Sequence, residues 1–234
     1  MPVLEGRDLV KRYDDRAALS GVSFVVDAGE CVAIAGPNGA GKTTLLSILS
    51  GVVKPDDGSI DLPGGNLGWV PQRAAVYGKL TVRENLELFA RLEKLPDVFG
   101  SATAMMDRIE LGHRASDRAE ELSGGMRQRL SIGMGLIADP AVLLLDEPSA
   151  ALDPLQRERL WELLGSLAAS GIAVVFSTHS AGEVEGHASR VLVLDGGRLL
   201  YDGAPAGIGP GAHFELAFIN FLRNKRSAAQ AVAE

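Results

Sequence analysis

The sequence predicts an α/β fold, in which strands and helices alternate around a mostly parallel sheet. A glycine-rich loop, Gly36-Pro-Asn-Gly-Ala-Gly-Lys-Thr43, lies between an apolar strand and a predicted helix. Residues 142–145 form a continuous apolar run, which is typical of a parallel strand covered on both faces. From Thr81 the apolar residues recur at helical spacing, so a helical insert is expected to interrupt the core.

The first eighty residues are predicted to be mainly strands separated by turn-rich stretches. One helix, 43–50, follows the glycine-rich loop and ends at Gly51. The expected strands are 3–9, 21–26, 30–35, 59–62 and 66–70.

The insert is expected over residues 81–121. Thr81-Val-Arg-Glu84 has the pattern of a capping box, with a glutamate three residues after the threonine. Apolar residues then follow at helical spacing, and helical character continues through 101–109. Two halves of the α/β core would therefore flank a helical segment.

After the insert, helices and strands alternate again. A helix is expected from Met126 toward Ile137, and Asp139-Pro140 would end it. The tail beyond Gly203 is rich in Gly and Pro, with weak helical character at 213–223. The other expected elements are strands at 141–145, 172–176, 190–194 and 198–201 and helices at 155–169 and 181–186.

Composition restricts the function classes. The 234 residues are 46% hydrophobic and 23% charged, which fits a single large domain with a packed core. The net charge of −7 argues against sequence-independent binding of nucleic acid, which depends on clustered Lys and Arg. The single cysteine, Cys31, cannot form an internal disulfide, and we expect it to be a small core residue in a reducing cytosol. His113, His187 and His213 have no motif around them and are expected to be surface or structural residues.

We expect this chain to associate with a membrane only through a separate partner protein. The first residues, MPVLEGRDLV, lack the basic and then apolar pattern of a signal peptide. No window approaches the roughly 20 consecutive apolar residues that span a bilayer. We therefore expect a chain that is soluble by itself.

The glycine-rich loop, called here the phosphate loop (36–43), matches the pattern G-x-x-x-x-G-K-[ST] in its required context. Its glycines let backbone N–H groups point inward at phosphate oxygens, and the helix that follows adds positive potential. Lys42 is expected to bridge the β- and γ-phosphates, and Thr43 is expected to ligate Mg²⁺.

Two carboxylates follow the apolar run in Val142-Leu-Leu-Leu-Asp-Glu-Pro148. Because neighbouring strand residues point to opposite faces, Asp146 and Glu147 should do different work. We expect Asp146 to hold Mg²⁺, through water, and Glu147 to polarise the attacking water.

A second stretch, Leu122–Arg129 (LSGGMRQR), also has features of a phosphate-binding site. Small residues stand at a predicted helix start, as in the phosphate loop, but no lysine is present. A chain with one nucleotide site does not obviously need this second motif.

GPNGAGKT, LSGGM and VLLLDEP, in this order and spacing, resemble the ATP-binding subunits of ABC (ATP-binding cassette) transporters. The similarity runs from about Val3 to Pro205. The resemblance implies a P-loop NTPase fold of the ABC ATPase type, with a mostly parallel core sheet, an antiparallel β subdomain at the N-terminus and a helical insert. It implies one domain over 1–234, divided into a core with the β subdomain (1–80 and 122–205), a helical subdomain (81–121) and a tail (206–234).

The resemblance also implies roles for single residues. Tyr13 would stack on adenine, Gln72 would reach Mg²⁺ and the attacking water, and His179 would contact the γ-phosphate and hold Glu147. Asp153 would lie at the contact between two subunits. Glu147, His179 and Gln72 would thus be catalytic, and Thr43, Gln72 and Asp146 would hold the metal. The residues expected to bind ATP are Tyr13, Gly36, Pro37, Asn38, Gly39, Ala40, Gly41, Lys42, Thr43 and Thr44.

In this family the LSGG stretch, the signature motif, contacts the γ-phosphate held by a second subunit. Ser123, Gly124, Gly125 and Met126 would therefore act across a dimer of identical or related ATPase chains. The cofactors implied are ATP and Mg²⁺. The partners implied are separate transmembrane permease subunits and no nucleic acid, at the cytoplasmic face of a prokaryotic cell membrane.

The sequence departs from the family pattern at a few positions. Met126 replaces the commonest glutamine, and with the basic residues after it the stretch resembles ATPases of ABC-2-type exporters. Ala150 and Ala151 stand where Ser/Thr and Gly are frequent. The alternatives are an ATPase that regulates a membrane complex without transport, an importer ATPase, or a soluble ABC ATPase acting on DNA or the ribosome. A single cassette, a short insert and an acidic charge argue against the last.

Overall fold

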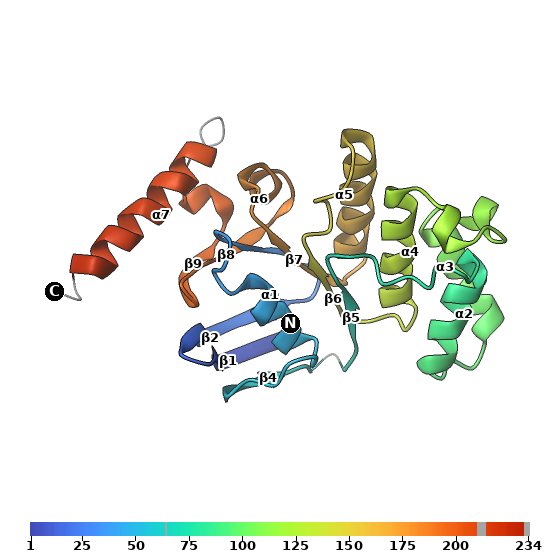
Figure 1. Cartoon of the computed structure of the whole chain (residues 1–234), viewed down its shortest axis with the longest axis horizontal. Helices are drawn as coiled ribbons and strands as arrows, with labels where there is room; N and C mark the ends of the chain where they lie inside the picture. The colour runs from blue at the N-terminus through green and yellow to red at the C-terminus, as the bar shows by residue number, and fades with distance from the viewer. Residues whose placement is uncertain (64, 210–213, 232–234) are drawn as a thin grey trace.

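A computed structural model describes residues 1–63, 65–209 and 214–231 of the chain (Figure 1). Strands β1 (Pro2–Tyr13), β2 (Arg16–Asp27) and β4 (Asp57–Asp61) form an antiparallel sheet in the order β2-β1-β4. The two first strands are longer than predicted, because their pairing continues up to the tight turn at Asp14-Asp15. The expected antiparallel β unit at the N-terminus is confirmed.

The second sheet is mostly parallel, as predicted. Only the pairing of β8 with β9 is antiparallel among its described strands. In their order across the sheet, the strands are β5 (Leu67–Val70), β6 (Val142–Asp146), β7 (Ala173–Thr178), β3 (Cys31–Ala35), β8 (Arg190–Asp195) and β9 (Arg198–Gly203).

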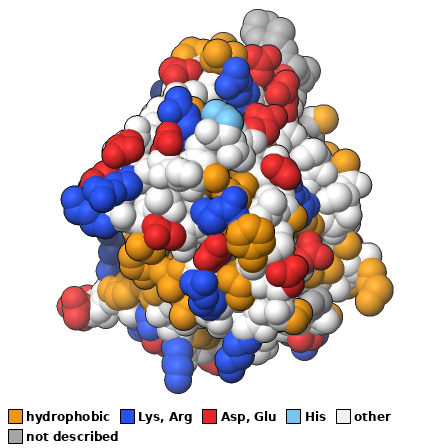
Figure 2. Space-filling view, turned by 90° about the vertical axis from the view of Figure 1, so that its right-hand side faces the viewer, with side chains coloured by type: hydrophobic (Ala, Val, Ile, Leu, Met, Phe, Trp, Pro, Cys, Tyr) orange, Lys and Arg blue, Asp and Glu red, His pale blue; other side chains and the backbone are white. Residues whose placement is uncertain are grey.

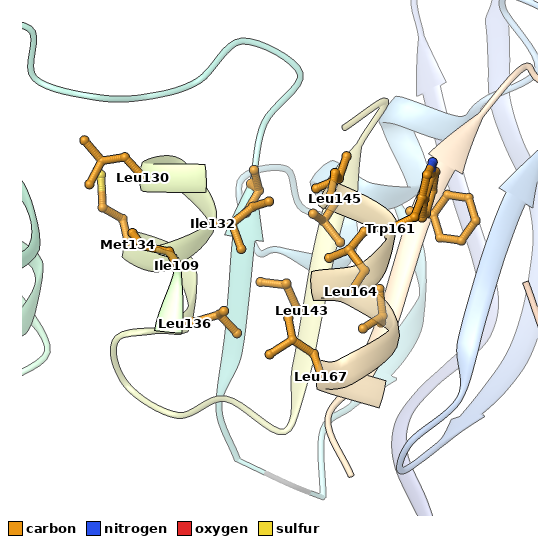
Figure 3. Close-up of a cluster of buried hydrophobic side chains, with 14 of the residues drawn as sticks. Ile109, Leu130, Ile132, Met134, Leu136, Leu143, Leu145, Trp161, Leu164 and Leu167 are labelled. Carbon is orange, nitrogen blue, oxygen red and sulfur yellow. The ribbon is translucent and has the colours of Figure 1, made fainter. Parts of the chain in front are cut away.

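Alternate residues of the central strands face two different cores. Val142 and Leu144 of β6 pack toward helix α1 (Lys42–Leu49) and the antiparallel sheet. Leu143 and Leu145 belong to the other core, with side chains of α4 (Gly124–Leu136) and α5 (Pro154–Ala169) (Figure 3). Helix α6 (Ala181–His187) also contributes side chains to this core. Both faces of the strand are therefore covered, which explains why its apolar run is continuous.

The helical segment consists of α2 (Val82–Leu92) and α3 (Val98–Arg108), followed by short 3₁₀ turns at Gly112–Arg114 and Ala119–Glu121. The predicted capping box is confirmed, since Thr81 and Glu84 exchange side-chain and backbone hydrogen bonds at the start of α2. Both helices pack against α4, to the right in Figure 1.

Helix α4 begins at Gly124, two residues before the predicted start. The Ser123 hydroxyl accepts a hydrogen bond from the Met126 N–H at 3.3 Å and caps the helix. The signature glycines therefore lie in the first turn, where backbone N–H groups have no partner within the helix.

At the C-terminal end, a 3₁₀ turn at Pro205–Gly207 precedes α7 (Phe214–Ala231), which packs against α6. Tyr201 and Phe221 meet edge to face with their ring centroids 5.7 Å apart. The helix is longer than the predicted 213–223, and His213 lies outside the described residues. Among the helices that are described, none has both the length and the apolar character needed to cross a membrane.

Candidate nucleotide site

The predicted site residues gather where parallel strands end. The phosphate loop follows β3, Gln72 follows β5, Asp146 and Glu147 lie at the end of β6, and His179 follows β7. Because the carboxyl ends of parallel strands lie at the same edge of a sheet, segments that are far apart in sequence become neighbours.

The phosphate loop needs glycine for steric reasons at two positions. At Gly36, with φ of 151°, a Cβ atom would lie 2.1 Å from the Leu194 carbonyl oxygen. At Gly41, with φ of 108°, it would lie 2.5 Å from the Ala18 carbonyl oxygen. These positive φ values disfavour other residues, and the two contacts show how tightly the loop is held against its neighbours.

The Lys42 side chain folds back onto the phosphate loop. Its ammonium group donates to the carbonyl oxygens of Gly36 at 2.8 Å and Pro37 at 3.1 Å, and the residue is 7% exposed. Burial lowers the pKa of Lys42, while the negative charges of Glu147 and Asp146 oppose that shift. The cation is thus held by neutral carbonyls, which an anionic ligand could replace.

A cleft of about 740 Å³ opens beside the loop. The hairpin of β1 and β2 forms one wall, and its Arg16 guanidinium donates to the Gly39 carbonyl oxygen at 3.0 Å. Sequence reasoning did not identify Arg16, which lacks a motif around it. Among the predicted site residues, the cleft is lined by Tyr13, Asn38, Gly39, Gly41, Lys42, Thr43, Thr44 and Glu147.

Asp146 is 4% exposed and faces the phosphate loop. Its Oδ1 accepts a hydrogen bond from Thr43 Oγ1 at 3.4 Å and another from the Ser177 hydroxyl. A hydroxyl and a carboxylate beside a phosphate site are oxygen donors of the kind that Mg²⁺ prefers, so these residues fit the metal. Within the described residues, no group of three or more His, Cys, Asp or Glu side chains could hold a metal ion.

Glu147 is the first residue beyond β6, and its side chain has other partners than that of Asp146. Its Oε2 accepts from the Gln72 amide at 3.0 Å, and its Oε1 lies 3.2 Å from His179 Nδ1. The backbone of Glu147 has a φ of 45°, which is uncommon for a residue other than glycine and marks local strain. The three predicted catalytic side chains therefore form one cluster.

Ser177 connects the two carboxylate residues. Its hydroxyl accepts the Glu147 N–H at 2.9 Å and donates to Asp146. Sequence reasoning missed this serine, which stands two residues before His179 and directly after the predicted strand 172–176. The sequence holds no signal for this role, because the pairing of β7 with β6 is visible only in the structure.

The signature residues lie outside the phosphate-loop cleft. Ser123, Gly125 and Met126 line a separate groove of about 180 Å³, together with Asp153. Asp153 also caps α5, because its carboxylate accepts the Gln156 N–H at 2.9 Å. Neither Ser123 nor Asp153 is therefore placed to touch a ligand held in the cleft of the same chain.

The fold and the site define a P-loop ATPase of the ABC class. Residues 19–150 match the family described as ABC transporter, and the chain belongs to that family. It is 40% identical over 215 residues to the Nod factor export ATP-binding protein I of Burkholderia pseudomallei (strain 1710b), covering 86% of this chain and 71% of that protein. A Rhizobium etli protein of the same name is 37% identical over 221 residues, covering 88% and 69%.

Solved structures of ABC subunits have the same fold. One described as the ATP-binding subunit of an ABC transporter matches with a TM-score of 0.83 and 28% identity, over 94% of this chain and 99% of that one. The cbiO1 protein of Clostridium perfringens, part of the ABC transporter complex cbiONQ, matches with a TM-score of 0.81 and 28% identity, over 88% and 90%. The chain is an ATP-binding subunit of an ABC transporter and an ATPase.

Proposed function

We propose that this ATPase drives export through a separate membrane-spanning partner and hydrolyses ATP in sites shared by two chains. The observation that carries the shared site is the separation of the signature groove from the phosphate-loop cleft. Export is supported by the names of the relatives, which are export ATP-binding proteins. Met126 in the signature motif also favours export, because it resembles the signature of ABC-2-type exporter ATPases.

The cleft would hold ATP along its length. Tyr13, at the exposed end of β1, would stack on adenine, and the N–H groups of the phosphate loop would bind the phosphate oxygens. Lys42 would exchange the carbonyls of Gly36 and Pro37 for the β- and γ-phosphates. The Lys42 ammonium group would therefore have hydrogen-bond acceptors in both states: backbone carbonyls without nucleotide and phosphate oxygens with it.

Glu147 is proposed to accept a proton from the attacking water. Gln72 and His179 contact its two oxygens and would hold the carboxylate in line with the γ-phosphate. Thr43, Asp146 and Gln72 would hold Mg²⁺, which when bound supplies positive charge beside the phosphates. Asp146 is kept in place for this by Ser177.

The second chain would supply Ser123, Gly124 and Gly125. These residues begin α4, where free N–H groups and the helix dipole favour a phosphate. Two identical patches that insert reciprocally require a two-fold dimer. ATP bound between both chains would favour the closed dimer, and hydrolysis would remove that preference.

The membrane partner is proposed to bind the helical subdomain, residues 81–121, at the cytoplasmic face of the membrane. Large apolar side chains are exposed there, at Leu92 of α2 and Phe99 of α3. Figure 2 looks onto this side of the molecule and shows hydrophobic side chains among charged ones. In membranes from cells that contain the partner, Leu92→Asp and Phe99→Asp should reduce co-sedimentation, whereas Val52→Asp, also exposed, should not.

Mixing two inactive variants tests the shared site. Lys42→Ala removes the phosphate contact of one half-site, and Ser123→Arg blocks the signature of the other. Each variant alone should be inactive, but a mixture should recover activity, because one complete site forms in each heterodimer. Ser116→Arg, at an exposed position outside both sites, is the control and should be active alone. If the folded mixture hydrolyses no ATP, the shared site is wrong.

A further inference from the structure

Glu183, in the first turn of α6, joins two loops of the site. Its Oε1 accepts a hydrogen bond from the Ser149 hydroxyl, and its Oε2 accepts one from the Thr178 hydroxyl at 2.6 Å. Ser149 is 4% exposed and Thr178 is 2% exposed. Both oxygens of one carboxylate are thus engaged by hydroxyls from different segments of the chain.

Each of these hydroxyls lies close in sequence to one member of the Glu147–His179 pair. Ser149 stands two residues after Glu147, and Thr178 directly precedes His179. The Thr178 hydroxyl also accepts the Ser180 N–H at 2.9 Å, so it holds the backbone on both sides of His179. The carboxylate therefore fixes the separation of the two loops that carry the pair.

Side-chain packing does not hold the pair by itself. The side chain of His179 is 61% exposed, compared with 18% for Glu147. A cavity of about 250 Å³ borders both residues, and its lining includes Arg157 and Glu183. Where a cavity replaces close packing, hydrogen bonds must set the distance between the loops. Bonds to a charged acceptor are the stronger kind.

We propose that Glu183 is a positioning residue for ATP hydrolysis: it holds the loops of Glu147 and His179 at the separation that the reaction needs. This inference rests on the proposed roles of Glu147 and His179. Glu183 itself lines the cavity behind the pair and not the nucleotide cleft, so it should affect turnover without touching ATP.

The test compares Glu183→Ala with Glu185→Ala, an exposed glutamate on the same helix. Steady-state ATPase activity, the affinity for a fluorescent ATP analogue and the melting temperature are measured for each. We expect Glu183→Ala to lower kcat at least about tenfold, because small misplacements of reacting groups are costly. KM and analogue affinity should stay within about twofold, because Lys42 and the phosphate loop are untouched. Glu185→Ala should match the parent.

Two further variants separate positioning from a general loss of structure. Ser149→Ala and Thr178→Val each remove one hydroxyl, and each should lower kcat with KM unchanged. Added to Glu183→Ala, either should cause little further loss, since the bridge is already broken. Glu183→Gln, which can still accept one hydrogen bond, should recover part of the activity.

The inference is overturned if Glu183→Ala keeps the parental kcat, or if it loses kcat, nucleotide affinity and melting temperature together. If that variant does not fold, parental activity in both Ser149→Ala and Thr178→Val also overturns it. Glu147→Gln and His179→Ala are assayed in parallel. If Glu147→Gln and His179→Ala retain turnover, the proposed catalytic roles of these residues are wrong. If both are inactive while Glu183→Ala has the parental kcat, only the positioning role of Glu183 is wrong.

Discussion

Nδ1 of His179 lies 3.2 Å from Oε1 of Glu147, although 32 positions separate the two residues in the sequence. The contact follows from the register of two neighbouring parallel strands, in which Asp146 of β6 is paired with Ser177 of β7. Each partner stands just beyond its strand, so the sheet itself brings a carboxylate and an imidazole together at the edge of the nucleotide cleft.

Replacing Glu147 by glutamine should abolish turnover but not binding. The amide keeps the size of the side chain and cannot accept the proton, so kcat should fall at least about 10²-fold. Phosphate contacts from Lys42 and the loop are unaffected, and ATP should then accumulate in a closed dimer. Phosphate release, analogue binding and size-exclusion chromatography with ATP measure these effects. Hydrolysis at the parental rate would show that another group is the base.

Ser177→Ala should lower the free energy of unfolding. The substitution leaves the Glu147 N–H and the Asp146 carboxylate without this buried partner, at a cost of about 1–3 kcal/mol in the free energy of unfolding. Ser166→Ala, which removes an exposed hydrogen bond to the Leu163 carbonyl, should change the free energy of unfolding by less than about 0.5 kcal/mol. Urea denaturation compares the two. Equal stabilities would mean that Ser177 does not organise the site.

Gly36→Ala and Gly165→Ala should have opposite effects on stability. An added Cβ at Gly36 would collide with a backbone carbonyl in a disfavoured conformation, which should destabilise the protein by roughly 2–4 kcal/mol. Gly165 lies inside α5 with open space around it, so alanine should stabilise the helix by roughly 0.5–1 kcal/mol. Thermal unfolding without nucleotide tests both changes, and a neutral Gly36→Ala would contradict the loop geometry.

Cys31 should resist thiol reagents in the native protein. Burial raises the pKa of its thiol to about 11, so at pH 8 about one molecule in a thousand carries the reactive thiolate. Unfolding returns the pKa toward its ordinary value near 8.5, and alkylation by iodoacetamide should accelerate at least about 100-fold. Mass spectrometry with and without denaturant follows the reaction. In the structure Cys31 is partly buried and packs against the core, so rapid labelling of the folded chain would contradict this burial.

Local patterns were enough to predict most of the fold. Apolar strands, the phosphate loop and the capping box at Thr81 depend on neighbours only a few residues away, so they can be recognised in the sequence. Boundaries were less predictable: α4 begins at Gly124 because the Ser123 hydroxyl caps it, and β1 and β2 extend to the turn because they pair with each other.

The sequence by itself determined the family and the candidate chemical groups: the lysine and glycines of the phosphate loop, the two carboxylates at the end of β6 and the histidine after β7. Motifs of this kind are local because each must present several groups from one turn or strand end. Only the tertiary structure decided which groups meet. It placed Ser177 between Asp146 and Glu147, Arg16 over Gly39, and Glu183 between Ser149 and Thr178. These contacts cross between separate strands and helices, and their geometry is set by strand register and packing, which no local pattern records.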